Sequence, residues 1–196
     1  MKKKPSTLKN MLLSLTLIAG AAALSVGVVS DITREPIEQA REAKLQAAIR
    51  VVLPEFDWLD TIVETKAVDG GILTFYRAYN NDEFVGTAVA TFTNRGFSGE
   101  IRLLVGLLPD GTIHNIDVLG HAETPGLGDK IEHRKSTWPQ QFQGKHPARF
   151  NLRVKQDGGD VDGITAATIT ARAYADAVQR AFDNLNFESG ELKNEN

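Results

Sequence analysis

Residues 101–119 read IRLLVGLLPDGTIHNIDVL, two apolar stretches joined by the tripeptide Pro-Asp-Gly. Proline presets its own φ for the first corner of a turn, and glycine permits a positive φ at low cost. Pro109–Gly111 therefore predicts a tight turn. β-Branched residues recur on both sides of it, which is typical of strands. The segment predicts a β-hairpin, two antiparallel neighbouring strands.

The chain on the N-terminal side of this hairpin has the same character. Further stretches rich in β-branched and aromatic residues are separated by the turn signals Asp69-Gly70-Gly71 and Asn80-Asn81-Asp82. Short strands joined by tight turns favour antiparallel pairing. The five predicted strands are Thr61–Val68, Ile72–Tyr79, Phe84–Thr93, Gly99–Leu107 and Thr112–Leu119.

Helical patterns lie on both sides of the strands. Ile37–Leu53 has helical spacing and is stopped by Pro54, and a short helical piece is predicted around Lys130–Phe142. Strands bracketed by helices predict an α+β fold, an antiparallel sheet with packed helices. The last helix carries one continuous apolar stripe, formed by Ala173, Ala177, Val178, Ala181, Phe182 and Leu185.

The segment Met11–Ser30 contains no charged residue. A helix of this length spans about 30 Å, the thickness of a bilayer core. Lysines precede it, which places the N-terminus in the cytoplasm and the rest of the chain outside. A cleaved signal peptide is the alternative, with Ala21–Ala23 as a small-residue cleavage site, but the apolar run exceeds the usual h-region. These lysines are Lys2, Lys3, Lys4 and Lys9.

The expected organisation follows from these patterns. One N-terminal transmembrane helix precedes a single folded domain, and a polar end is expected to be flexible. The predicted segments are a cytoplasmic N-terminus at 1–10, the transmembrane helix at 11–30, a helical connector at 31–54, the folded domain at 55–187 and the tail at 188–196.

Composition excludes several classes of function. The chain has no cysteine, so it offers no disulfide, no thiolate ligands for an iron–sulfur cluster and no thiol nucleophile. Without the four N-terminal lysines, 18 basic residues face 25 acidic ones, and a domain of about −7 is a poor surface for nucleic acid. The histidines lack a zinc spacing, and Asp157, Asp160 and Asp162 lack a calcium-loop pattern, so no metal site is expected.

The first of two segments that stand out is His121–Lys130, HAETPGLGDK. It begins where a predicted strand ends. Pro125 restricts the backbone, while Gly126 and Gly128 permit close approaches that other residues cannot make. Such a loop can lay peptide groups against a flat ligand, although these residues alone favour a tight connection before a helix.

The second segment is Asp160–Thr170, DVDGITAATIT, at the start of the final helix. A helix N-terminus presents unpaired N–H groups and partial positive charge, so it favours a phosphate, and Arg172 could add a cationic donor. The alternative is a helix start capped by threonine with no ligand. Of the three threonines, Thr170 is expected to tolerate replacement by valine best.

Together the two segments, about 40 residues apart, resemble a known pairing. The sequence resembles the G subunit of Rnf electron-transport complexes and, more broadly, the FMN-binding domain family shared with the C subunit of the sodium-translocating NADH:quinone reductase. The resemblance covers the whole chain, anchor included. Its acceptor motif, Asp-x-x-Ser/Thr-Gly-Ala-Thr-x-Ser/Thr, matches Asp162–Thr170, and it implies covalent FMN, esterified through its phosphate to Thr168.

The resemblance also implies a set of cofactor-binding residues and no catalytic residue in the chain itself. One departure is Ala166, where the family usually has glycine. If that position requires a positive φ, alanine costs on the order of 1 kcal/mol. The implied cofactor-binding residues are Thr165, Ala166, Ala167 and Thr168 at the acceptor, and Glu123, Thr124, Gly126, Leu127 and Gly128 in the loop that approaches the flavin.

The implied function is that of a membrane-anchored flavoprotein subunit of an ion-translocating complex of the ferredoxin/NAD type. Its implied partners are the other subunits, the membrane and a flavin transferase for maturation. The location is the cytoplasmic membrane, with the C-terminal domain on the extracytoplasmic side. Three alternatives remain open: the C subunit of a sodium-translocating NADH:quinone reductase, a stand-alone flavin reductase, and a non-redox membrane-tethered binding module in which Thr168 only caps a helix.

Overall fold

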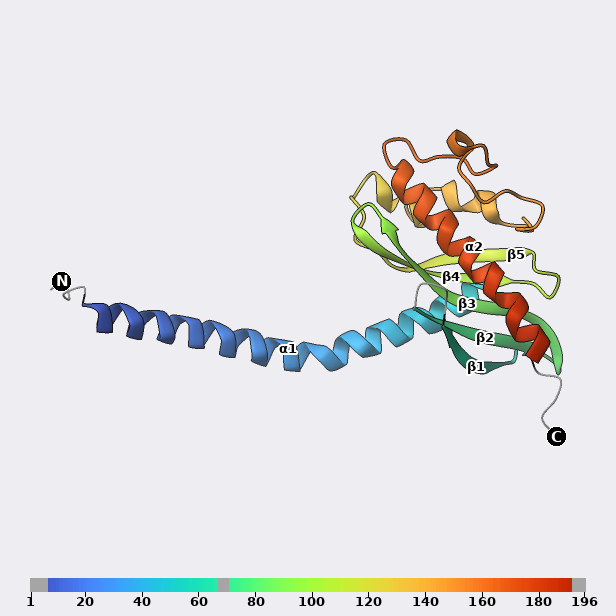
Figure 1. Cartoon of the computed structure of the whole chain (residues 1–196). Helices are drawn as coiled ribbons and strands as arrows, with labels where there is room; N and C mark the ends of the chain where they lie inside the picture. Colours follow the sequence, from blue (N-terminus) through green and yellow to red (C-terminus); the bar gives the residue numbers. More distant parts are fainter. Residues whose placement is uncertain (1–6, 67–70, 192–196) are drawn as a thin grey trace. The chain divides into compact units, whose positions relative to one another are not determined.

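The computed structural model describes residues 7–66 and 71–191 and divides at Lys44 into two units (Figure 1). Helix α1, Leu8–Val52, contributes to both of them. The sequence predicts a membrane helix and a separate connector helix, and the structure joins them through Pro36. The proline costs one backbone hydrogen bond, because the carbonyl four residues earlier loses its donor. That residue, Ile32, is exposed, so its carbonyl can bond water instead.

The first unit contains the predicted membrane segment. The apolar side chains of Met11–Ser30 are exposed around the whole helix, and the segment is long and apolar enough to cross a membrane. A helix that is apolar on every side is stable only when its surroundings are apolar too. The lysines at positions 2–4 lie outside the described residues.

The second unit is built on a five-stranded antiparallel sheet in the order β1-β2-β3-β4-β5. Each strand pairs with its neighbours in sequence, as tight hairpins require. In the quoted hairpin, Leu108 N–H donates to the Thr112 carbonyl at 2.8 Å and Gly111 has φ +85°, so the predicted turn is confirmed. The strands are β1 Trp58–Lys66, β2 Ile72–Asn80, β3 Glu83–Gly96, β4 Gly99–Leu107 and β5 Ile113–Gly120. The turn predicted at Asp69–Gly71 lies mostly outside the described residues.

Both faces of the sheet are covered. Helix α2, Thr168–Glu191, packs on one face, mainly over β3 and β4 (Figure 1). The last turns of α1 pack on the other face through Ala48, Ile49 and Val52. Gly106 in β4 makes this second contact possible, because a Cβ there would overlap the Val52 carbonyl oxygen. The predicted α+β fold with an antiparallel sheet is therefore confirmed.

The apolar stripe of α2 is buried as the sequence predicts. Ala173, Ala177, Val178 and Ala181 are fully buried, and Leu185 is partly buried against the same core. The helix continues to Glu191, four residues into the segment assigned to a tail, while residues 192–196 lie outside the described part of the chain.

The long connection from β5 to α2 contains both motifs. The single helix predicted around Lys130–Phe142 is wrong: the structure has two 3₁₀ turns, η1 Gly128–Ile131 and η2 Trp138–Phe142. Pro139 at the start of η2 explains the break, because proline fits the first turn of a helix but cannot continue one. A third 3₁₀ turn, η3 Lys155–Asp157, precedes the acceptor segment.

Candidate functional site

The turn that leads into α2 is tight. Ala167 N–H donates to the Ile164 carbonyl at 2.9 Å, and Ala166 has φ +63°. This is the left-handed region, which favours glycine over every residue with a Cβ. The position at which the family usually has glycine therefore does adopt a positive φ here, and alanine adopts it at a cost of about 1 kcal/mol in stability.

Thr168 is the first residue of α2. It is half-buried, whereas Thr165 and Ala166 are exposed and Ala167 is buried. The Thr168 hydroxyl therefore lies at the N-terminus of a long helix, in reach of solvent. The first-turn N–H groups of a helix have no intrahelical acceptor, and they carry partial positive charge. This is an arrangement that can hold a phosphate ester.

The loop at Thr124–Gly128 is closed by its own backbone. The Thr124 carbonyl accepts N–H bonds from Leu127 at 3.2 Å and Gly128 at 3.0 Å, and Gly126 adopts φ +76°. Pro125 and Gly126 are exposed, and Leu127 exposes 40% of its surface. The loop thus presents backbone and one apolar side chain outward, as contact with a flat ring would require.

Glu123 differs from its neighbours because its side chain points inward. It is 5% exposed, and both carboxylate oxygens are engaged. Oε2 accepts the Thr170 hydroxyl at 2.5 Å, and Oε1 accepts the Ser98 N–H at 2.9 Å. Of the residues that the resemblance assigns to the cofactor, the structure thus places Glu123 beneath the loop and not on its outer surface.

His121 holds the start of the same loop. Its Nδ1 accepts the Glu123 N–H at 3.0 Å, so the other nitrogen, Nε2, carries the proton and donates to Glu132 at 2.8 Å. Burial by itself raises the pKa of Glu132, but hydrogen bonds from His121 and Arg134 outweigh it and hold that pKa below its usual range. The sequence places His121 near the flavin loop but gives no sign of Glu132, because the pairing depends on the 3₁₀ turn between them.

A second contact fixes the approach to Thr168. Trp138 Nε1 donates to the Asp162 carbonyl, and the Asp162 N–H donates to Gln141 Oε1, both at 2.6 Å. The Trp138 ring packs edge-on against Tyr174 with centroids 5.1 Å apart. Only the fold shows that the Trp138 N–H supports the acceptor segment.

Arg172, which the sequence suggests as a donor to a phosphate, has a carboxylate partner in the structure. Its guanidinium forms a bidentate pair with Asp157, at 2.6 and 2.8 Å. The hydrogen bonds of this pair raise the pKa of Arg172 and lower that of Asp157. The pair forms because Asp157 lies in η3, which brings it beside the first turns of α2.

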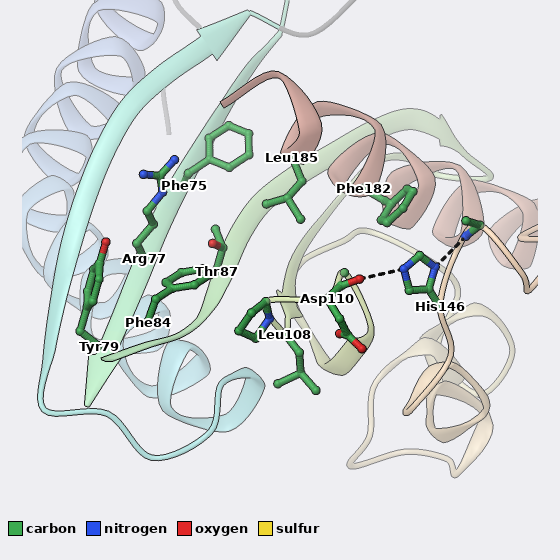
Figure 2. Close-up of a pocket in the computed structure, with 13 residues that line it drawn as sticks. Phe75, Arg77, Tyr79, Phe84, Thr87, Leu108, Asp110, His146, Phe182 and Leu185 are labelled. Carbon is green, nitrogen blue, oxygen red and sulfur yellow. Dashed lines mark hydrogen bonds between the residues drawn. The ribbon is translucent and has the colours of Figure 1, made fainter. Parts of the chain in front are cut away.

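Two cavities lie near α2, and neither is lined by Thr168 or by the loop. One of about 740 Å³ borders Ile169 and Arg172. The other, of about 640 Å³, lies between the sheet and the C-terminal half of α2, where Phe75, Phe84 and Phe182 line it (Figure 2). Phe182 lies about 21 Å along the helix from Thr168. Thr168 is half-buried and the outer side of the Thr124–Gly128 loop is exposed, so both can be reached without entering either cavity.

The chain is similar to known proteins over most of its length. The profile of a family described as FMN-binding domain matches residues 96–183, a range that contains the loop, the acceptor turn and most of α2. A relative from Vibrio atlanticus, named as the G subunit of an ion-translocating oxidoreductase complex, is 35% identical over 89% of this chain and 88% of its own length. Proteins of the same name from Shewanella loihica and Erwinia tasmaniensis are 34% and 35% identical, over 97% and 89% of this chain and 95% and 90% of theirs.

Proposed function

The chain belongs to the G-subunit family of ion-translocating oxidoreductase complexes, and we propose that it carries FMN as a phosphate ester on Thr168. Bound FMN would supply the redox chemistry, accepting and donating electrons singly or in pairs. The protein supplies the attachment point and positions the flavin ring. The chain would pass electrons between neighbouring subunits and would not catalyse a reaction in isolation.

The observation that carries the proposal is the position of the Thr168 hydroxyl. It lies at the start of a 24-residue helix, preceded by a turn whose residue Ala166 has φ +63°. A phosphate diester there can accept first-turn N–H bonds from Ile169 and Thr170. Thr165 is exposed before the helix begins, and the Thr170 hydroxyl already donates to Glu123. Of the three threonines, Thr168 is the one that combines access with a helix N-terminus.

The loop at Thr124–Gly128 is the surface we assign to the flavin ring. Its backbone is exposed on the outer side and Leu127 adds an apolar contact. Gly126 has open space where a Cβ would stand, so a ring can approach the peptide groups directly. Replacing Gly126 by valine would therefore change the absorption or the midpoint potential of the flavin but leave attachment possible.

We place the flavin domain on the extracytoplasmic side of the cytoplasmic membrane, anchored by Met11–Ser30 in α1. The partners are the other subunits of a complex of the ferredoxin/NAD type, together with a flavin transferase that attaches FMN. Reporter fusions after Glu35 test the orientation: an exported reporter should be active there, and a cytoplasmic signal would overturn it. The same fusions distinguish a retained anchor from a cleaved signal peptide, through the size of the product.

Attachment is tested by expressing the full chain with a flavin transferase and mapping the flavin-carrying peptide by mass spectrometry. Thr168→Val keeps the shape of the side chain but removes the oxygen, so the added mass of FMN should disappear. Thr165→Val should retain FMN on the original peptide, although at a lower yield if the transferase recognises that residue. FMN found on Thr165 or Thr170, or retained by Thr168→Val, would overturn the assignment.

A further inference from the structure

Glu123 joins three segments that are distant in sequence. Its carboxylate lies between the β3–β4 turn, which supplies the Ser98 N–H, and the first turn of α2, which supplies the Thr170 hydroxyl. The residue itself belongs to the loop that starts at His121. Thr170 is fully buried, so water cannot replace either partner of this bond. A buried carboxylate needs such donors, because burial without them is costly.

Two glycines make room for the carboxylate. A Cβ at Gly128 would lie 2.9 Å from Oε2 and 3.1 Å from the Thr170 hydroxyl oxygen. A Cβ at Gly96 would meet the Gly99 carbonyl oxygen and would also lie 2.7 Å from Oε1. Real Cβ atoms essentially never come within 3.0 Å of such atoms, so both positions need glycine for space. Gly128 therefore serves the carboxylate beneath the loop as well as the loop itself.

The hydrogen bond between Thr170 and Glu123 also lies close in sequence to the acceptor Thr168. Thr170 is two residues after Thr168, in the same first turn of α2. Glu123 directly precedes Thr124, whose carbonyl closes the loop. One hydrogen bond thus links the segment that would hold the phosphate to the segment that would contact the ring.

We propose that Glu123 is a positioning residue, which through its hydrogen bond to Thr170 holds the Thr124–Gly128 loop in register with the Thr168 hydroxyl. The inference rests on the proposed attachment of FMN at Thr168. It assigns Glu123 no contact with the flavin. It also reverses the expectation that Thr170 tolerates valine best of the three threonines, because the Thr170 hydroxyl is the one on which the register depends.

The charge of Glu123 adds an electrostatic consequence. A carboxylate fixed beside the N-terminus of α2 interacts with the positive end of the helix dipole. It also opposes the arrival of further negative charge on a nearby flavin, since like charges repel more strongly in a buried setting than in water. Removing the charge without changing the shape, as in Glu123→Gln, should therefore shift the midpoint potential of bound flavin upward.

The test uses the full chain, expressed with a flavin transferase, and follows FMN attachment over time by intact mass. Thr170→Val removes the donor and should slow attachment by on the order of tenfold, since hydrogen bonds to charged groups are worth about that factor or more. Thr170→Ser keeps the hydroxyl and should restore most of the rate. Glu123→Gln should attach FMN and show the upward shift in potential.

Thr91→Val is the matched control. Thr91 is also a buried threonine whose hydroxyl donates to α2, to the Ala177 carbonyl at 3.1 Å, but it lies away from the acceptor turn. It should lower the unfolding temperature without changing the attachment rate or the flavin potential. If Thr170→Val behaves in the same way as Thr91→Val in all three measurements, its role is structural only and the proposal fails.

Two further outcomes are distinguishable. If Thr170→Val does not fold, Glu123→Gln decides the question, because an unchanged attachment rate together with an unchanged potential would overturn the proposal. If the unaltered chain takes up no FMN at all, the proposed function fails first. In that case the unfolding temperatures of the variants still report the bond, but not its role in register.

Discussion

Replacing Ala166 by glycine should stabilise the domain. Ala166 has φ +63° and its side chain is exposed, so the change removes backbone strain and no packing. The left-handed conformation costs a residue with a Cβ about 1–2 kcal/mol. Glycine has more conformational freedom than alanine in the unfolded chain, and this reduces the gain in stability by about 0.4–1 kcal/mol. The net gain in the free energy of unfolding is therefore at most about 1.6 kcal/mol, or up to about 6 °C in Tm for a domain of this size.

The assay is thermal unfolding of the full chain in detergent, followed by tryptophan fluorescence. Both tryptophans of the chain, Trp58 and Trp138, lie in the second unit, so the signal reports that unit and not the membrane helix. Ala148→Gly is the matched control, since Ala148 is exposed but has no positive φ. It should lower the unfolding free energy by about 0.4–1 kcal/mol.

The opposite substitution completes the set. Gly126 has φ +76° and open space around it, so Gly126→Ala adds strain without a clash and should destabilise by about 1 kcal/mol. The reasoning would be refuted if Ala166→Gly lowered the Tm by as much as Ala148→Gly does. That result would mean that the acceptor turn does not require a left-handed residue.

Three further predictions concern the packing and the polar contacts. The pKa of Glu132 is lowered in the folded state, so the ionised carboxylate stabilises the domain above the ordinary carboxyl range, and this contribution is lost as the pH falls through the lowered pKa. Between about pH 6 and 3, the Tm should therefore fall more in the unaltered chain than in Glu132→Gln. Gly106→Ala should destabilise by about 1–3 kcal/mol, measured by urea unfolding, because the new Cβ overlaps the Val52 carbonyl. Trp138→Phe keeps an aromatic ring but leaves the Asp162 carbonyl without its donor. It should lower the free energy of unfolding by about 1 kcal/mol, measured by urea unfolding with the fluorescence of Trp58 as the signal.

The strands were predictable because their signals are local. The Pro109–Gly111 turn places β4 and β5 side by side, and the same logic orders the rest of the sheet. The helix predicted over Lys130–Phe142 failed for a local reason too: Pro139 restarts the chain as a new 3₁₀ turn. The extent of α1 was not predicted because its two halves show different patterns, an uncharged apolar run and then helical spacing, and only the structure shows that the helix continues through Pro36.

The candidate site divides in the same way. The acceptor turn and the glycine loop are short motifs, so the resemblance that they carry implies Thr168 and Thr124–Gly128 as site residues without a fold. The sequence also shows an apolar segment long enough for a membrane, because hydrophobic length is a property of composition alone. The inward position of Glu123, its bond to a threonine 47 residues away and the positive φ of Ala166 were decided only by the tertiary structure. Hydrogen bonds between distant segments and the dihedral of one turn residue depend on how the sheet and α2 pack together, and no local pattern encodes that packing.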